Sequence, residues 1–241
     1  AAPPTPDELR ASNRAYWQSV AQANPAQLEQ AIIGALIGSA SPHASQRAVL
    51  DKLHAGESVL AVMATGRGNS LIFQTFAAHL ALAKGQASLF VYPLRALIAD
   101  QAFHLTCAFE RFGLACAVLT GESSPDERAA AYEGLAQGTV DIVRTTPEFL
   151  SFHAERLAQT GRIGFMVVDE AHHIGLAKAG QRLAYRELGD VARRLGDPVV
   201  LAVTAAAPDE VACDIRETLP LGSSVVDDAA RDNLHVCDHR N

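Results

Sequence analysis

The stretch VLAVMATGRGNS, residues 59–70, decides the fold. It begins as an apolar run that is typical of a buried strand, and it breaks at a turn that contains Gly66 and Gly68. From Ser70 onward the pattern is that of a helix. A buried strand that leads through a glycine turn into a helix predicts an α/β protein.

The glycine turn carries most of the groups that bind nucleotide phosphates. In such loops the backbone N–H groups cradle the phosphates, a lysine reaches the outer phosphates, and a Ser or Thr hydroxyl holds Mg²⁺. Asn69 stands where the lysine is expected, and an ordinary strand-to-helix turn is the alternative interpretation. The candidate nucleotide-binding residues are Thr65, Gly66, Arg67, Gly68, Asn69 and Ser70.

A second buried-type strand ends on two adjacent carboxylates. The stretch IGFMVVDEAH, residues 163–172, places Asp169 and Glu170 at the carboxyl end of this strand. This is where α/β proteins hold metal ions and catalytic groups, although acidic residues there also serve as helix caps. Together with the glycine turn, the pair favours a site for a nucleotide and Mg²⁺.

Apolar runs alternate with amphipathic stretches along most of the chain. This alternation predicts a doubly wound, mostly parallel sheet flanked by helices. Ahead of it, a helical pattern from about Asp7 and a second one over residues 31–38 predict an N-terminal α-helical extension packed on the core. The expected strands lie near residues 59–64, 88–93, 114–120, 141–146, 163–168 and 199–204.

Composition narrows the class of protein. A chain of 241 residues with 49% hydrophobic content can bury a large core. The absence of a long apolar run and of a signal-peptide pattern predicts a soluble, intracellular (cytoplasmic) protein. The net charge of −7 argues against a protein that coats nucleic acid with its whole surface, so a nucleic-acid strand would have to bind along a local groove.

The four cysteines have neither CxxC spacing nor a zinc pattern with nearby histidines. We therefore expect free thiols, no structural metal and no disulfide from Cys107, Cys116, Cys213 and Cys237.

Taken in order along the chain, several segments resemble the motifs of superfamily 2 helicases of the DEAH-box, RecQ-like kind. Residues 59–70 and 163–172 resemble motifs I and II. The resemblance covers about residues 42–236. Further matches are VYPLRAL (91–97) to motif Ia, TTPEFL (145–150) to the TPExL motif, LAVTAAA (201–207) to motif III, RLAYREL (182–188) to the R-P-x-Y segment and RDNL (231–234) to the start of the second lobe.

The resemblance implies a RecA-like P-loop NTPase fold and an ATP-dependent DNA helicase. It implies a helical extension over residues 1–41, an ATP-binding domain over 42–230, and over 231–241 the start of a linker to a second helicase domain of the same parent chain, which is missing here. It also implies that ATP and Mg²⁺ bind, with Ser70 and Asp169 holding the metal. The remaining implied nucleotide-site residues are Glu170 as the base for the attacking water, Gln46 as the reader of adenine, and His172 and Thr204 as the couplers to the nucleic-acid groove.

The resemblance also implies a groove for single-stranded DNA, with RNA as a second option. Contacts there would go to the sugar-phosphate backbone, so binding would be largely independent of sequence. The residues carried over to this groove are Pro93, Arg95, Gly121, Arg144, Thr146, Pro147, Glu148 and Arg182.

Departures from the family pattern suggest impaired chemistry. Asn69 removes a cation whose loss commonly costs about 3 kcal/mol or more, so weak nucleotide binding and little hydrolysis are expected. Ala206 replaces the second threonine of motif III, Ala177 and Gln181 occupy aromatic positions of a DNA-sensing loop, and His43 replaces an arginine. Two alternatives stay open: an inactive nucleotide or nucleic-acid binding module, and a P-loop enzyme acting on a small molecule.

Overall fold

The computed structural model describes residues 1–63, 66–99, 109–177, 183–205 and 207–227. In these residues a seven-stranded sheet runs in the order β3-β4-β2-β5-β6-β1-β7, and every pairing in it is parallel. The predicted doubly wound parallel sheet is confirmed. Its strands are β1 (Val59–Val62), β2 (Ala87–Val91), β3 (Cys116–Leu119), β4 (Ile142–Thr145), β5 (Ile163–Val168), β6 (Val199–Thr204) and β7 (Ser223–Val226).

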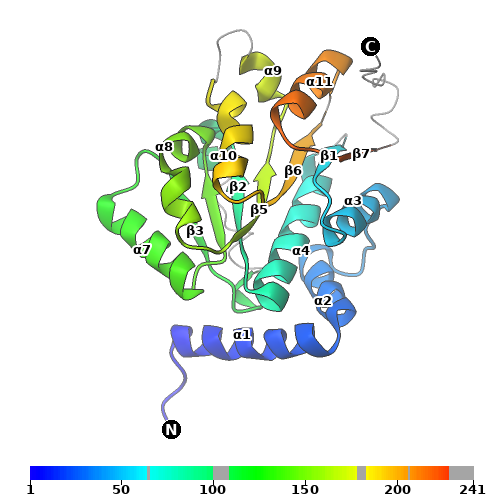
Figure 1. Cartoon of the computed structure of the whole chain (residues 1–241). Helices are drawn as coiled ribbons and strands as arrows, with labels where there is room; N and C mark the ends of the chain where they lie inside the picture. The colour runs from blue at the N-terminus through cyan, green and yellow to red at the C-terminus, as the bar shows by residue number, and fades with distance from the viewer. Residues whose placement is uncertain (64–65, 100–108, 178–182, 206, 228–241) are drawn as a thin grey trace.

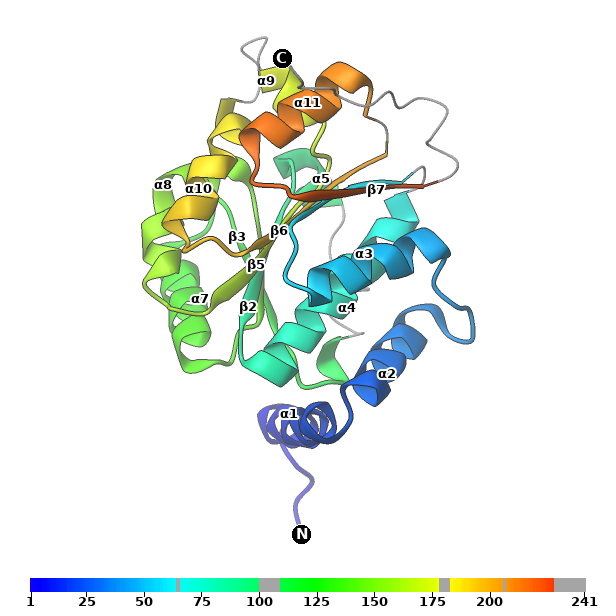
Figure 2. The ribbon, with the colours of Figure 1, turned by 45° about the vertical axis from the view of Figure 1, so that its right-hand side comes forward.

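Helices cover both faces of the sheet (Figures 1 and 2). The helices that come early in the chain cover one face of the sheet, and the later helices cover the opposite face. The early helices are α1 (Pro6–Ala23), α2 (Pro25–Ile37), α3 (Ala44–His54), α4 (Gly66–Lys84) and α5 (Leu94–Ala99). The later ones are α7 (Pro125–Gln137), α8 (Pro147–Ala158), α9 (His173–Ala177), the 3₁₀ helix η1 (Leu183–Glu187), α10 (Leu188–Arg194) and α11 (Asp209–Thr218).

Strand β1 shows why this sequence needs two helical layers. Leu60 and Val62 pack into the core on one face, whereas Val59 and Ala61 pack into the core on the other. All four residues are buried, because side chains alternate between the two faces of a strand and both faces are covered. This burial explains the continuous apolar run in the sequence.

The N-terminal extension is attached to the sheet by buried charges. Helix α1 begins with a capping box in which Thr5 and Glu8 satisfy each other's backbone N–H groups. Arg14 on α1 then donates two hydrogen bonds of 2.7 Å to the carboxylate of Asp141, which is fully buried just before β4. Arg162 donates to the same carboxylate at 3.3 Å. The extension is therefore packed on the core, as predicted.

The state of the cysteines differs from the expected one. Cys213 on α11 is disulfide-bonded, so the prediction that all four thiols are free is wrong. Spacing along the chain does not report which thiols the fold brings together, and this is why the pattern failed. Cys116 is free, and burial raises the pKa of its thiol to about 12. In the described part of the chain, no helix combines the length and the apolar character needed to cross a membrane.

Two groups with lowered pKa values lie where α2, α3 and α4 meet. The pKa of the Glu29 carboxyl falls to about 2, mainly through its hydrogen bond with His54 and also through Arg47, against the opposing effect of burial. The pKa of His79 falls to about 4, because burial disfavours its charged form and because His54 and Lys84 repel it. Both shifts keep the native state less protonated than the unfolded chain.

We expect stability to fall in acid in two overlapping windows. Between pH 6.5 and about 4 the unfolded chain protonates His79 but the native state does not, so stability falls as the pH falls. Below about pH 4.5 protonation of Glu29 adds a second loss. Urea unfolding at pH 7, 5.5 and 4 measures the free energy of unfolding. Between pH 7 and pH 4 this free energy should fall less in His79→Gln than in the unsubstituted chain, by on the order of 1–2 kcal/mol after allowance for solvent screening. An unchanged pH profile in this variant would contradict the assignment.

Candidate functional site

The loops singled out in the sequence meet at the carboxyl edge of the sheet, because β5, β6 and β1 are neighbours. The N–H of Asp169, directly after β5, donates to the carbonyl of Val91 on β2 at 2.9 Å. The N–H of Met63, directly after β1, donates to the carbonyl of Thr204 at 3.0 Å. Backbone hydrogen bonds thus fix the ends of the motif-bearing strands relative to one another.

The two carboxylates sit on a sharp local turn. Glu170 has a φ of +50°, in the left-handed region that side-chain-bearing residues rarely adopt. Its N–H donates to Oδ1 of Asp169 at 2.9 Å, and the N–H of Ala171 donates to the carbonyl of Val203 at 2.9 Å. Such backbone conformations cost about 1–3 kcal/mol and cluster at functional sites. The side chain of Glu170 is 45% exposed, so it is open to a ligand.

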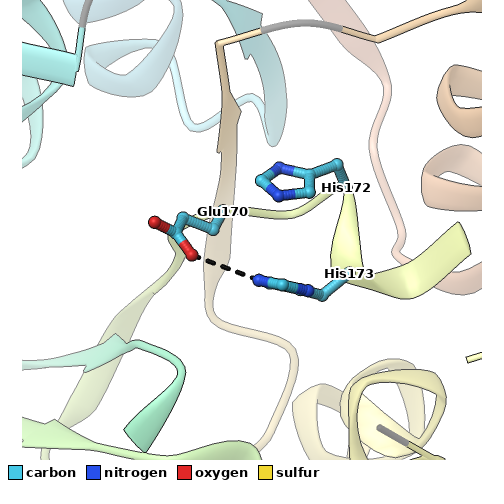
Figure 3. Close-up of side chains that lie close together, drawn as sticks. All are labelled: Glu170, His172 and His173. Atoms are coloured by element: carbon cyan, nitrogen blue, oxygen red, sulfur yellow. Dashed lines mark hydrogen bonds and ion pairs between the residues drawn. The ribbon is translucent and has the colours of Figure 1, made fainter. Parts of the chain in front are cut away.

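Two histidines follow the carboxylates and belong to the same cluster (Figure 3). Nδ1 of His172 lies 3.2 Å from the hydroxyl of Thr204, which is buried at the end of β6. Nε2 of His173 lies 3.1 Å from a carboxylate oxygen of Glu170. His173 was not among the site residues predicted from the sequence. Its position beside the acidic pair was the only available signal.

The glycine turn supplies the start of α4. Gly66 to Ser70 occupy the first turns of this helix, where backbone N–H groups have no partner within the helix and can bind an anion. Asn69 is only 4% exposed, and within the described residues its Oδ1 has no hydrogen-bond partner. The hydroxyl of Ser70 and the carboxylate of Asp169 are hard oxygen donors of the kind that Mg²⁺ prefers. Thr65 lies outside the described residues.

Gln46 lies on α3 and is buried. Its Oε1 accepts a hydrogen bond of 2.7 Å from the backbone N–H of His43, which fixes the start of the helix. Recognition of adenine by Gln46 therefore stays a prediction.

The candidate nucleic-acid residues lie on the other half of the same edge, after the neighbouring strands β2, β4 and β3. Arg95, Gly121 and Glu148 are exposed there. Thr146 is buried, and its hydroxyl accepts a hydrogen bond from the N–H of Phe149 at 3.2 Å, which caps α8. Pro93 and Pro147 are also buried, and Arg182 lies outside the described residues.

The structure places Arg144 where it cannot reach a nucleic-acid strand. It lies within β4 with 1% of its surface exposed, and its guanidinium stacks over the ring of Tyr92, 5.0 Å from the centroid. The expected contact between Arg144 and a phosphate is wrong, because both faces of this strand are covered by helices. The strand predicted over residues 141–146 already contained this position, but the pattern did not show that the arginine side chain would be buried.

The profile of the DEAD/DEAH box helicase family matches residues 43–214, which is most of the chain. The chain belongs to the DEAD/DEAH box helicase family. Within this family, the Arabidopsis thaliana protein "ATP-dependent DNA helicase Q-like 2" is 29% identical over 209 residues, which is 83% of this chain and 28% of that protein. The Bacillus subtilis (strain 168) protein "ATP-dependent DNA helicase RecQ" is 30% identical over 184 residues, which is 75% of this chain and 30% of that protein.

These relatives confirm the RecQ-like resemblance, and solved helicase structures confirm the fold. The structure of "DUF1998 helicase MrfA" superposes with a TM-score of 0.64 at 23% identity, over 83% of this chain and 32% of that one. A hypothetical ATP-dependent RNA helicase from Sulfolobus tokodaii gives a TM-score of 0.60 at 17% identity, over 82% and 57%. This DEAD/DEAH box chain spans less than a third of the two sequence relatives named above.

Proposed function

We propose that the chain acts as the first motor lobe of a RecQ-like ATP-dependent DNA helicase, which binds ATP with Mg²⁺ and single-stranded DNA. The observation that carries the proposal is the meeting of three loops at one sheet edge: the start of α4, the acidic pair after β5 and Thr204 at the end of β6. This is the edge at which open α/β sheets bind ligands.

Each nucleotide-site residue has a task that suits its chemistry. The N–H groups of Gly66 to Asn69 bind the phosphates, and Ser70 and Asp169 hold Mg²⁺, which neutralises phosphate charge when bound. Glu170 orients the attacking water and takes its proton, and Gln46 binds adenine. Because Glu170 is 45% exposed, its carboxylate is accessible to this water.

His172 and Thr204 join the nucleotide half of the edge to the rest of the motor. Their contact of 3.2 Å links the loop after β5 to the end of β6. A change at the acidic pair can therefore pass to β6 through one side-chain contact. A second lobe of the same parent chain, following a linker over residues 231–241, is the proposed partner in translocation.

The alternative is a binding module that kept the helicase fold and lost hydrolysis. Asn69 favours this alternative, because a buried neutral amide stands where a cation would neutralise phosphate charge. The motifs after β2 and β4 speak against a P-loop enzyme for a small molecule, since their exposed residues would serve a nucleic-acid strand.

Arg95→Ala tests the proposed DNA groove. Arg95 is exposed on α5 at the carboxyl edge, so its loss should weaken binding of single-stranded DNA by about 3–10-fold for every sequence tested. One lost phosphate contact should also reduce the slope of log affinity against log salt concentration by about 0.7. Fluorescence anisotropy with labelled oligonucleotides at several salt concentrations measures both quantities.

Arg193→Ala is the matched control, because Arg193 has a side chain that is 68% exposed and lies at the end of α10, away from this edge. It should leave both quantities unchanged. Equal effects of the two substitutions would show that binding reflects overall charge and not a groove. Failure of the unsubstituted chain to bind single-stranded DNA would refute this part of the proposal.

A further inference from the structure

Glu170, His172 and His173 form a cluster of metal-binding side chains (Figure 3). One ligand atom from each of the three lies within 4.8 Å of the other two. Two of the atoms, Oε2 of Glu170 and Nε2 of His173, are already 3.1 Å apart. Ligands held about 2.0–2.1 Å from a tetrahedral metal are separated by about 3.3 Å, so small side-chain rotations would complete the set.

The surrounding contacts orient the ligands. Nδ1 of His172 is engaged with the hydroxyl of Thr204 at 3.2 Å, which leaves Nε2 as the ligand atom. In Figure 3 this nitrogen is on the side of the ring that faces Glu170 and His173. The ring of His173 lies 5.3 Å from the ring of Tyr185, centroid to centroid. Histidine ligands are commonly held in this way through their second nitrogen and their neighbours.

We propose that this cluster binds a borderline divalent metal of the zinc class, at a site separate from that of Mg²⁺. Two imidazole nitrogens and one carboxylate oxygen suit Zn²⁺, Co²⁺ and Ni²⁺, whereas Mg²⁺ prefers oxygen ligands. The exposed carboxylate of Glu170 gives the ion access from solvent and leaves a fourth position for water. The site therefore binds zinc in the presence of excess Mg²⁺.

The site has a consequence for hydrolysis, and this consequence rests on the proposed function. A metal held by Glu170 occupies the carboxylate that takes the proton from the attacking water. Zinc then acts as an inhibitor of ATP hydrolysis that excess Mg²⁺ does not relieve.

Titration with Zn²⁺ in excess Mg²⁺ and without nucleotide, by isothermal calorimetry, tests the site. The chain contains nine histidines, so the decisive quantity is the difference between variants in bound metal per chain. His173→Gln and Glu170→Gln should each weaken the binding of one zinc equivalent at least about tenfold, because each substitution reduces the ligands from three to two. Co²⁺ in place of Zn²⁺ should give a visible absorption band that both variants lose.

His153→Gln is the matched control, because His153 lies on α8 and is not part of the cluster. It should bind zinc as the unsubstituted chain does. Equal zinc binding by all variants, or none by the unsubstituted chain, would overturn the proposal. Thermal unfolding checks that His173→Gln is folded, and Glu170→Gln changes a half-exposed side chain, so the test does not depend on one variant. The readout is metal binding in the absence of nucleotide. Failure of the zinc-site proposal can therefore be distinguished from failure of the ATPase proposal.

Discussion

Asn69→Lys should raise the affinity of the chain for ATP with Mg²⁺ at least about tenfold, and hydrolysis by a factor of about a hundred wherever hydrolysis can be measured. The reason is electrostatic. Position 69 is 4% exposed in the first turn of α4, beside the N–H groups proposed to bind phosphate. In such a desolvated place a lysine charge interacts with phosphate far more strongly than in water. Titration with fluorescent ATP and ADP measures the affinity.

Asn69→Met is the matched control, since methionine has nearly the length of lysine and no charge. It should bind nucleotide no better than the unsubstituted chain. Equal tightening by Met and Lys would show that shape and not charge limits binding. If neither the unsubstituted chain nor the Lys variant bound nucleotide, the ATP-motor interpretation would fail and the binding-module alternative would replace it.

Asp141→Ala should destabilise the fold by about 3–5 kcal/mol. The carboxylate is fully buried and accepts hydrogen bonds from Arg14 and Arg162, so its removal leaves two guanidinium groups without their shared counter-charge. It also accepts from the N–H of Ala115 at 3.2 Å, which ties the start of β3 to the start of β4. Urea unfolding at pH 7 measures the change.

Asp190→Ala is the comparison for this substitution. Asp190 pairs with Arg193 and Arg194 on α10, but its side chain is 57% exposed, so the loss should stay below about 1 kcal/mol. A similar cost for both substitutions would show that the buried pair contributes no more than a surface pair. Arg14→Ala separates the part of the effect that comes from attaching α1.

Much of the fold could be predicted because most of the strands are buried on both faces. Each of the six predicted apolar runs overlaps a strand, and β5 and β6 have the predicted bounds. The carboxyl-edge positions of Asp169 and Thr204 followed from strand direction alone. Strand β7 was missed because it is only half-buried and begins with two serines, so it lacks the apolar run by which the others were found.

The remaining differences come from contacts between residues far apart in sequence. The resemblance carried Arg144 over to the nucleic-acid groove, yet this side chain is buried and lies over the ring of Tyr92. The disulfide of Cys213 and the contact between His173 and Glu170 likewise depend on tertiary placement, which residue spacing does not encode. Local pattern predicts elements, but it does not report which side chains they bring together.

The hydrogen bond from Asp169 to Val91 directly links the two halves of the carboxyl edge. It joins the strand that carries the acidic pair directly to the strand that leads to Pro93 and Arg95, with no intervening element. Thermodynamic linkage makes any influence across this ladder mutual. If nucleotide tightens the hold on a DNA strand by some factor, the DNA strand must tighten the hold on nucleotide by the same factor.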